Sequence, residues 1–233
     1  MGSNPVEARF FPVFDNTQQR FVGYYCLPRR TLDDGKVVSD EMLLSQGMDV
    51  KSVNTALVVE NMLGTVRRGF AKALAQVNEG NGKLVIIPIN GAALVRKEIA
   101  TEFTAFCKTV PQEVFQAVVF EVTNVSDASA MSFLDEVAIV LYLFCATYSC
   151  RISPLTQNYS FYATCNYASV TLALGGQKLP VEKLGPHLQR VSQKAETSRL
   201  DVYLHGVPDT ETKAAVERSG IRYMDGPGVT EDA

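Results

Sequence analysis

Five polar residues stand at or just after the ends of apolar runs in the sequence, where side chains are free to do chemistry. They are Arg29, Asn90, Glu121, His205 and Asp225. A guanidinium such as that of Arg29 can bind a phosphate bidentately or stack on a base, and neither action needs a metal. The alternative is that Arg29 is an ordinary loop cation. The imidazole of His205 can bind a soft metal, although a single histidine at a strand end is more often packed or hydrogen-bonded.

The apolar runs that carry these residues alternate with longer helical patterns, as in a mainly parallel sheet wrapped by helices. Strands are predicted at residues 9–14, 20–27, 83–90, 116–123, 149–152, 169–174, 200–205 and 221–224. Helices are predicted at residues 50–77, 92–108, 128–147, 181–196 and 209–219. Functional side chains of an α/β barrel project from the carboxyl ends of its strands. The five polar residues are therefore expected at that end.

Three local signals refine this prediction. The short polar turn at residues 15–19 joins the first two strands, so these should pair as an antiparallel hairpin. The first long helix is followed by Gly-Asn-Gly at residues 80–82, as a glycine that ends a helix should be. The last helix is preceded by Pro-Asp-Thr at residues 208–210, which predicts an N-terminal cap.

The bulk composition suits one cytoplasmic domain. The chain has 233 residues, 46% of them apolar, enough for one substantial core. We expect a tail or cloning remnant at residues 1–8, a barrel domain at 9–229 and a second tail at 230–233. The formal charge of −3 without a basic tract argues against nucleic acid as a partner. No apolar run approaches the ~20 residues of a membrane-spanning helix, so no membrane contact is expected, and the five cysteines are expected to be reduced.

Several segments resemble motifs of the EAL family of cyclic di-GMP phosphodiesterases. Residues 21–29 (FVGYYCLPR) resemble its strand G-F-E-A-L-x-R, residues 87–90 (IPIN) its strand ending in a metal-binding Asn, and residues 119–123 (VFEVT) its L-E-I-T strand. Residues 200–211 (LDVYLHGVPDTE) and 220–226 (GIRYMDG) track V-I-A-E-G-V-E-T-E-E-Q and G-x-x-x-x-Q-G. The resemblance implies an α/β fold, a TIM-like (β/α)8 barrel of EAL type with an antiparallel first strand.

Matched residue by residue, the resemblance implies that most of the metal site is lost. The acidic or amide positions of the family fall at Tyr25, near Leu155 and Thr156, loosely at residues 172–174, and at His205, Pro208 and Asp225. Only Asn90 and Glu121 remain from the metal shell. One carboxylate and one amide cannot reproduce the oxygen cage of a two-metal hydrolase. We therefore expect no catalytic residue, no bound metal and no cofactor.

The resemblance leaves a ligand site open. Cyclic di-GMP is a candidate ligand of Arg29, Asn90, Glu121, His205 and Asp225, with Arg29 the one residue whose family role is ligand contact without metal. Tyr25 either stacks on a base or blocks the vacated site, and its bulk favours blocking. The substitutions near Leu155 and Ala173 predict an apolar mouth, which disfavours a dianionic ligand because burying unpartnered phosphate is costly.

An aromatic segment is the candidate interface. Tyr159, Phe161, Tyr162 and Tyr167 lie where the family has its dimerisation region, so an exposed cluster would favour a protein partner or a homodimer. Buried, the same residues would be core, which is slightly favoured because they do not share one helical face.

Three functions follow from the sequence. The first is a non-catalytic signalling domain that acts as a cyclic di-GMP receptor, a protein-interaction module or both, and the resemblance implies a role in motility or biofilm regulation. The second is a nucleotide-independent scaffold, attached to other modules of a parent protein or bound to a partner. A working phosphodiesterase is the least favoured.

Overall fold

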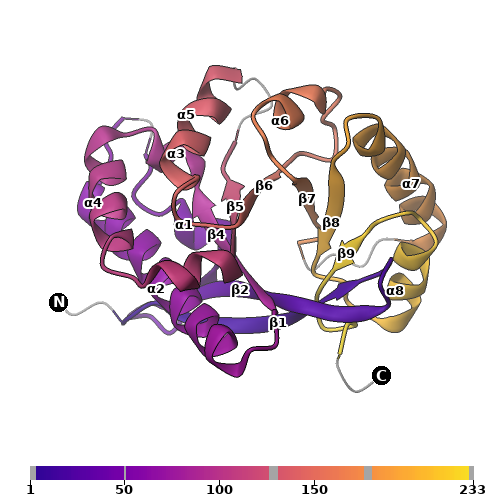
Figure 1. The fold of residues 1–233 in the computed structure, drawn as a ribbon, viewed down its shortest axis with the longest axis horizontal. Coiled ribbons are helices and arrows are strands. Elements are labelled where there is room, and N and C mark those ends of the chain that lie inside the picture. The colour runs from indigo at the N-terminus through magenta and orange to yellow at the C-terminus, as the bar shows by residue number, and fades with distance from the viewer. Residues whose placement is uncertain (1–3, 50, 126–130, 176–179, 231–233) are drawn as a thin grey trace.

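The computed structural model describes residues 4–49, 51–125, 131–175 and 180–230 as a closed barrel with helices outside it (Figure 1). The barrel strands are β1 (Glu7–Asp15), β2 (Arg20–Thr31), β4 (Leu84–Asn90), β5 (Val118–Thr123), β6 (Thr147–Arg151), β7 (Ser169–Ala173), β8 (Asp201–His205) and β9 (Tyr223–Met224). The ring runs β1-β9-β8-β7-β6-β5-β4-β2 and closes through the β1–β2 pairing. The short strand β3 (Val37–Ser39) adds to the far end of β2.

The first two strands form the predicted antiparallel hairpin. Its register runs from Glu7 opposite Arg29 to Asp15 opposite Arg20, with an irregularity between Val13 and Phe14. Asp15 makes the turn, since its Oδ1 accepts backbone hydrogen bonds from Thr17 and Gln18 at 2.8 and 2.9 Å. The strands β2 and β4 to β9 are mutually parallel around the ring, while β1 is antiparallel to both of its neighbours. The carboxyl ends of the parallel strands therefore share one end of the barrel, here called the mouth, and their amino ends share the base.

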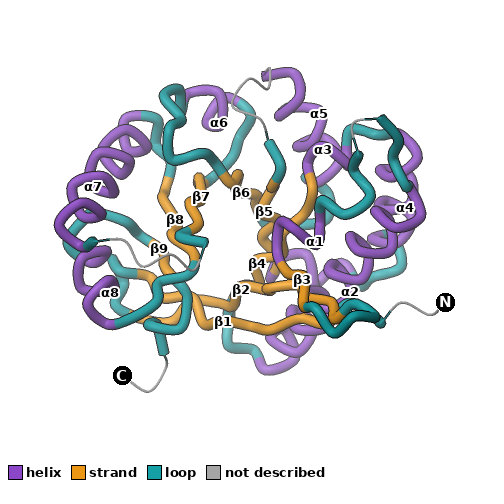
Figure 2. Tube along the Cα trace, turned by 180° about the vertical axis from the view of Figure 1, so that it is seen from behind, coloured by secondary structure: helices purple, strands orange, loops and turns teal. Residues whose placement is uncertain are grey.

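Helices surround the ring of strands (Figure 2). They are α1 (Asp40–Leu44), α2 (Thr55–Glu79), α3 (Gly91–Leu94), α4 (Lys97–Cys107), the 3-10 helix η1 (Gln112–Ala117), α5 (Met131–Leu141), α6 (Ser160–Thr164), α7 (Val181–Thr197) and α8 (Thr210–Glu217). Gly80 ends α2 with φ 66°, and Asp209 caps α8 by accepting a hydrogen bond from the Thr212 amide, both as predicted. Within the described part of the chain, no helix has the length and apolar character needed to cross a bilayer.

Several predicted boundaries are wrong for local reasons. The helix predicted at 50–77 begins at Thr55, where the side chain of Asn54 caps it, and the helix predicted at 92–108 breaks at Arg96, whose backbone is extended. The helix predicted at 128–147 ends at Leu141, because the apolar run beyond it turns and enters β6 at Thr147. Residues 128–130 of this predicted helix lie outside the described residues, as do residues 1–3 and 231–233 of the expected tails.

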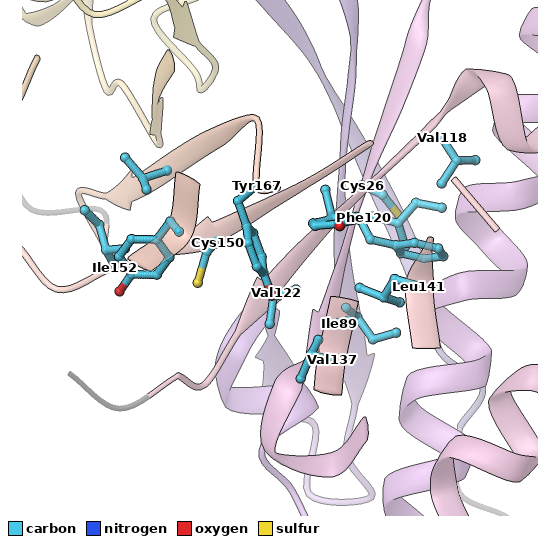
Figure 3. Close-up of a cluster of buried hydrophobic side chains, with 14 of the residues drawn as sticks. Cys26, Ile89, Val118, Phe120, Val122, Val137, Leu141, Cys150, Ile152 and Tyr167 are labelled. Atoms are coloured by element: carbon cyan, nitrogen blue, oxygen red, sulfur yellow. The ribbon is translucent and has the colours of Figure 1, made fainter. Parts of the chain in front are cut away.

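The strands bury two separate apolar layers. The larger one lies between the outer faces of the strands and the helices, and Figure 3 shows Ile89 and Val122 of the barrel meeting Val137 and Leu141 of α5. The smaller one lies inside the barrel and is built from Val13, Tyr25, Ile86, Val119 and Tyr203. Because side chains alternate along a strand, β1, β2, β4, β5 and β8 contribute to both layers, whereas β6 and β7 contribute apolar side chains to the outer layer alone. The inner layer separates the mouth from the base.

The outer layer predicts a contrast between two isoleucines. Ile89 is fully buried, while Ile139 on α5 is 61% exposed. We expect Ile89→Ala to lower the free energy of unfolding by about 2–5 kcal/mol, through lost burial and a cavity. We expect Ile139→Ala to change it by less than about 0.5 kcal/mol. Urea unfolding followed by circular dichroism suits a chain without tryptophan, and equal losses in the two variants would contradict the assigned layers.

Candidate functional site

A buried arginine lies at the centre of the mouth. Arg151 ends β6 and is 8% exposed. Its Nε and Nη2 donate to the two carboxylate oxygens of Glu121 at 3.0 and 2.8 Å, and its Nη1 donates to Asp40 Oδ2 at 2.8 Å. A fork of two hydrogen bonds to one carboxylate is the strong geometry for a guanidinium. Arg151 thus holds together carboxylates from β5 and from the start of α1.

Glu121 is the fully buried anion of this group. Besides the Arg151 fork, its Oε1 accepts a hydrogen bond from the hydroxyl of Thr171 and lies 3.0 Å from His205 Nε2. Burial raises the pKa of Glu121, but the charges of Arg151 and His205 outweigh burial and hold that pKa well below its usual range. Glu121 is therefore an ionised carboxylate whose two oxygens already have donors.

His205 connects Glu121 to a second carboxylate. Its Nδ1 lies 2.6 Å from Asp225 Oδ2, which also accepts a hydrogen bond from the hydroxyl of Tyr203. Burial lowers the pKa of His205, but Glu121 and Asp225 raise it further, to about 9. The ring is therefore an imidazolium at neutral pH, with both nitrogens donating. Both ring nitrogens of His205 are thus hydrogen-bonded, which is the alternative to a metal ligand that the sequence left open.

Tyr25 fills the space beside His205. Their ring centroids lie 4.2 Å apart, and Tyr25 is 2% exposed. Its hydroxyl donates to Asp40 Oδ1 at 2.7 Å and accepts from Arg151 Nη2 at 2.8 Å. Burial is the main cause that raises the pKa of Tyr25 well above its usual value, so the side chain stays a neutral phenol. The tyrosine therefore completes the network as well as occupying space.

Asp40 reaches the network from an unusual backbone position. It is the first residue of α1 and has φ 50°, in the left-handed region that few non-glycine residues adopt. Its two side-chain oxygens bind Tyr25 and Arg151. Counting carboxylates and cations, Asp40, Glu121 and Asp225 contribute three negative charges against the two of Arg151 and His205. The core of the mouth thus carries a net charge of about −1.

Asn90 and Glu121, which the sequence resemblance assigns to a metal shell, do not fit a divalent cation. Both oxygens of Glu121 are taken by donors, two of which are cations. Asn90 is also committed, because its Nδ2 donates to the Leu44 carbonyl at 2.9 Å and its Oδ1 accepts from the Ala93 amide at 3.0 Å. In the described ranges, no group of three or more His, Cys, Asp or Glu is arranged to hold a metal ion. A hard cation needs free oxygen ligands, which these two side chains do not offer.

The structure joins Glu121, His205 and Asp225 in one hydrogen-bonded network, while Asn90 is buried at the same end of the barrel with bonds to Leu44 and Ala93 instead. Asn90, Glu121, His205 and Asp225 are buried at the mouth. Arg29 shares no hydrogen bond or ion pair with them in the described chain, and instead pairs with Glu7 Oε2 at 3.0 Å with half of its side chain exposed. The expectation of an apolar mouth is wrong, because charged side chains occupy it.

The aromatic segment divides into buried and exposed residues. Tyr159, Tyr162 and Tyr167 are buried, with Tyr162 and Tyr167 in edge contact at 6.2 Å, while Phe161 is 40% exposed. The three tyrosines thus lie in the core, which was the alternative to an interface. Only Phe161 presents a large part of its side chain to solvent.

Sequence reasoning missed four members of the network. They are Asp40, Arg151, Thr171 and Tyr203. Arg151 carried a usable signal, since a charged residue two positions after Ser149 falls on the same, inward side of a buried strand. Asp40 carried none, because its place depends on β3 and α1, which the apolar pattern did not predict.

Comparison with known proteins supports the fold. No family model and no curated protein matches the chain. Solved structures that match include Vibrio cholerae LapD S helix-GGDEF-EAL in its apo form, with a TM-score of 0.72 and 11% identity over 95% of this chain and 52% of that one. The Bacillus subtilis YkuI protein with an EAL domain, in complex with cyclic di-GMP and calcium, matches with a TM-score of 0.66 and 16% identity over 95% and 53%.

An EAL domain protein from Listeria monocytogenes EGD-e also matches, with a TM-score of 0.64 and 14% identity over 96% of this chain and 86% of that one. The chain therefore has the barrel fold of EAL-domain proteins, as the sequence motifs implied, and its first strand is antiparallel to the second. It spans about half the length of the LapD and YkuI chains. At these identities the likeness is one of fold.

The His205 contacts predict a pH dependence of stability. Folding raises the pKa of His205 from 6.5 to about 9. The contribution of His205 to the free energy of unfolding is therefore fully present below pH 6.5 and is lost as pH rises through about 9. At pH 6 the free energy of unfolding of the unsubstituted protein should be higher than that of the His205→Gln variant by up to about 3 kcal/mol. The difference should shrink towards pH 10. Urea unfolding at each pH measures it.

The other histidine supplies the control for this prediction. His187 lies on α7, and no hydrogen bond or ion pair is described for its side chain. His187→Gln should keep the pH profile of the parent. A constant difference between the parent and His205→Gln from pH 6 to 10 would show that His205 is not held as an imidazolium.

Proposed function

We propose that this EAL-type barrel is a signalling domain that does not hydrolyse cyclic di-GMP and that works through contacts with other proteins or modules. The observation that carries the proposal is the occupied state of Glu121, whose carboxylate is bound by Arg151, Thr171 and His205. A two-metal hydrolase must hold its cations in open oxygen cages and orient a hydroxide between them. Here the side-chain cations of Arg151 and His205 bind the Glu121 carboxylate in place of a metal ion.

The charge of the mouth also speaks against tight binding of a nucleotide there. Cyclic di-GMP is a dianion, and the mouth core has a net charge of about −1. Its guanidinium makes four hydrogen bonds, to Glu121, Asp40 and Tyr25, so a phosphate that took the place of either carboxylate would have to displace an existing ion pair. Breaking such a pair leaves an uncompensated charge, which costs about 3–5 kcal/mol. Tyr25 adds a steric barrier, in keeping with its assignment as a blocking residue.

One observation favours a second function, that of a cyclic di-GMP receptor. The sequence resemblance matches Arg29 to a ligand contact that needs no metal, and the ion pair of Arg29 with Glu7 is about half exposed on both sides. Exposed ion pairs contribute roughly 0–1 kcal/mol, so exchanging Glu7 for a phosphate would cost little. The exposed fraction of Arg29 is thus the feature that keeps this function as the alternative.

The contact surface that we assign lies at the end of α5. Ile139 lies in the last turn of α5, and Tyr142 and Leu143 lie in the turn that follows it; the three side chains are 61%, 59% and 59% exposed. Apolar groups this exposed and this close together are typical of interaction sites. The partner is another module of a longer protein, a separate protein in motility or biofilm regulation, or a second copy of this chain.

Calorimetry and a hydrolysis assay test the mouth together. We expect no hydrolysis of cyclic di-GMP with Mg²⁺ or Mn²⁺. Titration with EDTA present should show no saturable heat up to about 0.1 mM nucleotide, a limit that corresponds to about −5.5 kcal/mol. Metal-dependent hydrolysis would contradict the proposed function.

The Arg29→Ala variant separates the two candidate functions. Saturable micromolar binding of cyclic di-GMP in EDTA that is lost in this variant would favour the receptor function over the interaction function. Lys36→Ala removes another exposed cation near the end of β2, on the loop before β3, and serves as the matched control. Binding lost equally in both variants would indicate a non-specific effect of charge.

Two leucines test the α5 surface. Leu143→Lys should reduce retention of the partner by about tenfold or more, because a charge replaces an apolar contact. Leu155→Lys, at a residue 77% exposed but away from α5, should leave it unchanged. Affinity capture from the source cells measures a foreign partner and sedimentation velocity measures self-association. Equal effects of both substitutions would contradict the assigned surface.

A further inference from the structure

A cavity opens at the base of the barrel, at the opposite end from the mouth. It has a volume of about 280 Å³ and is reached between Gln18, Arg20 and Gly82, which are exposed. Its floor is the inner apolar layer, with Ile86, Val119 and Tyr203 among the residues that line it. The cavity is therefore separate from the charged network above that layer.

The cavity exists because one wall of the barrel is built from small side chains. Thr147, Ser149 and Ser169 face inward from the first half of β6 and β7. Barrel interiors are ordinarily filled by layers of bulky branched residues. The facing wall follows that rule with Val13, Val22 and Leu84. Hydroxyl-bearing residues opposite valine and leucine give a space with one polar and one apolar side.

Ser149 points to a ligand in this space. The residue is 1% exposed and lines the cavity, and its Oγ has no hydrogen-bond partner among the described residues. A buried hydroxyl is normally hydrogen-bonded, because leaving it unpaired loses the bonds that it made to water. The Ser149 hydroxyl is thus a buried donor and acceptor that is left unpaired at the wall of the cavity.

The charges at the entrance cancel. Asp15 and Asp201 line it and share Arg222, whose Nε lies 3.3 Å from Asp15 and whose Nη1 lies 2.8 Å from Asp201. Arg20 supplies a second positive charge and donates to Gln18 at 2.7 Å. Two carboxylates and two guanidinium groups leave no net charge, and the interior has none. An ion would therefore be desolvated without a counter-charge, whereas an uncharged molecule would not.

We propose that the base cavity is a binding site for a small uncharged molecule with an apolar, ring-sized body and one group that hydrogen-bonds Ser149. An apolar cavity of about 150 Å³ holds one benzene ring, so the volume here admits a fused two-ring body. The apolar body packs on Val13, Ile86 and Val119, and the polar atom of the ligand meets the Ser149 hydroxyl. This site is independent of the proposed function of the mouth.

A matched pair of probes tests the site. Indole and indene have nearly the same shape, but only indole carries an N–H that can donate to Ser149 Oγ. In the parent protein we expect saturable shifts of the Ile86 and Val119 methyl resonances, with indole bound about fivefold more tightly than indene. In Ser149→Ala the two probes should bind equally. Ser153→Ala, on the loop after β6, should keep the preference of the parent.

A second variant guards against misfolding of the first. Ser169→Leu places a bulky side chain on the small wall beside Ser149, and it should abolish binding of both probes while the far-ultraviolet circular dichroism stays that of the parent. No saturation up to about 5 mM probe, shifts confined to the mouth, or an unchanged preference in Ser149→Ala would each overturn the proposal.

Discussion

The fork of hydrogen bonds between Arg151 and Glu121 is the interaction on which the mouth of this barrel depends. A fully buried carboxylate is stable only with a close counter-charge and donors for its lone pairs. Arg151 supplies the larger share of both, and Thr171 and His205 supply the rest. The same guanidinium then draws Asp40 and Tyr25 inward. The arrangement of six elements around the mouth thus follows from neutralising one buried negative charge.

Above and below the inner apolar layer, the barrel interior has different chemistry. The mouth holds a network of buried ion pairs, while the base has a cavity with small hydroxyl side chains on one wall. Tyr203 belongs to both parts, because its ring lines the base cavity and its hydroxyl donates to Asp225 at the mouth. The alternation of side chains along short strands makes such a division possible, since inward-facing residues recur at every second position of a strand and so lie at different levels of the barrel.

The parts of the fold that were predictable from sequence are those that local chemistry determines. The polar turn after β1, the glycine after α2 and the aspartate before α8 each specify a backbone conformation within a few residues. The four buried strand-end residues were likewise found because each follows an apolar run. Arg151 and Asp40 could not be joined from sequence, as they lie 111 positions apart and meet only when the ring closes. Without these two residues, the charged character of the mouth was not predicted.

The positive charges inside the mouth limit the routes by which such a barrel could change its chemistry. Replacing Arg151 alone would free oxygens on Glu121, but it would leave a buried anion with one of its two counter-charges removed before any metal ligand had been added. Adding carboxylates first would deepen the negative charge already present. A transition between this barrel and a metal-binding one therefore needs several coordinated substitutions, and each single intermediate is less stable than either end. Single substitutions therefore do not convert the present network of ion pairs into a metal site.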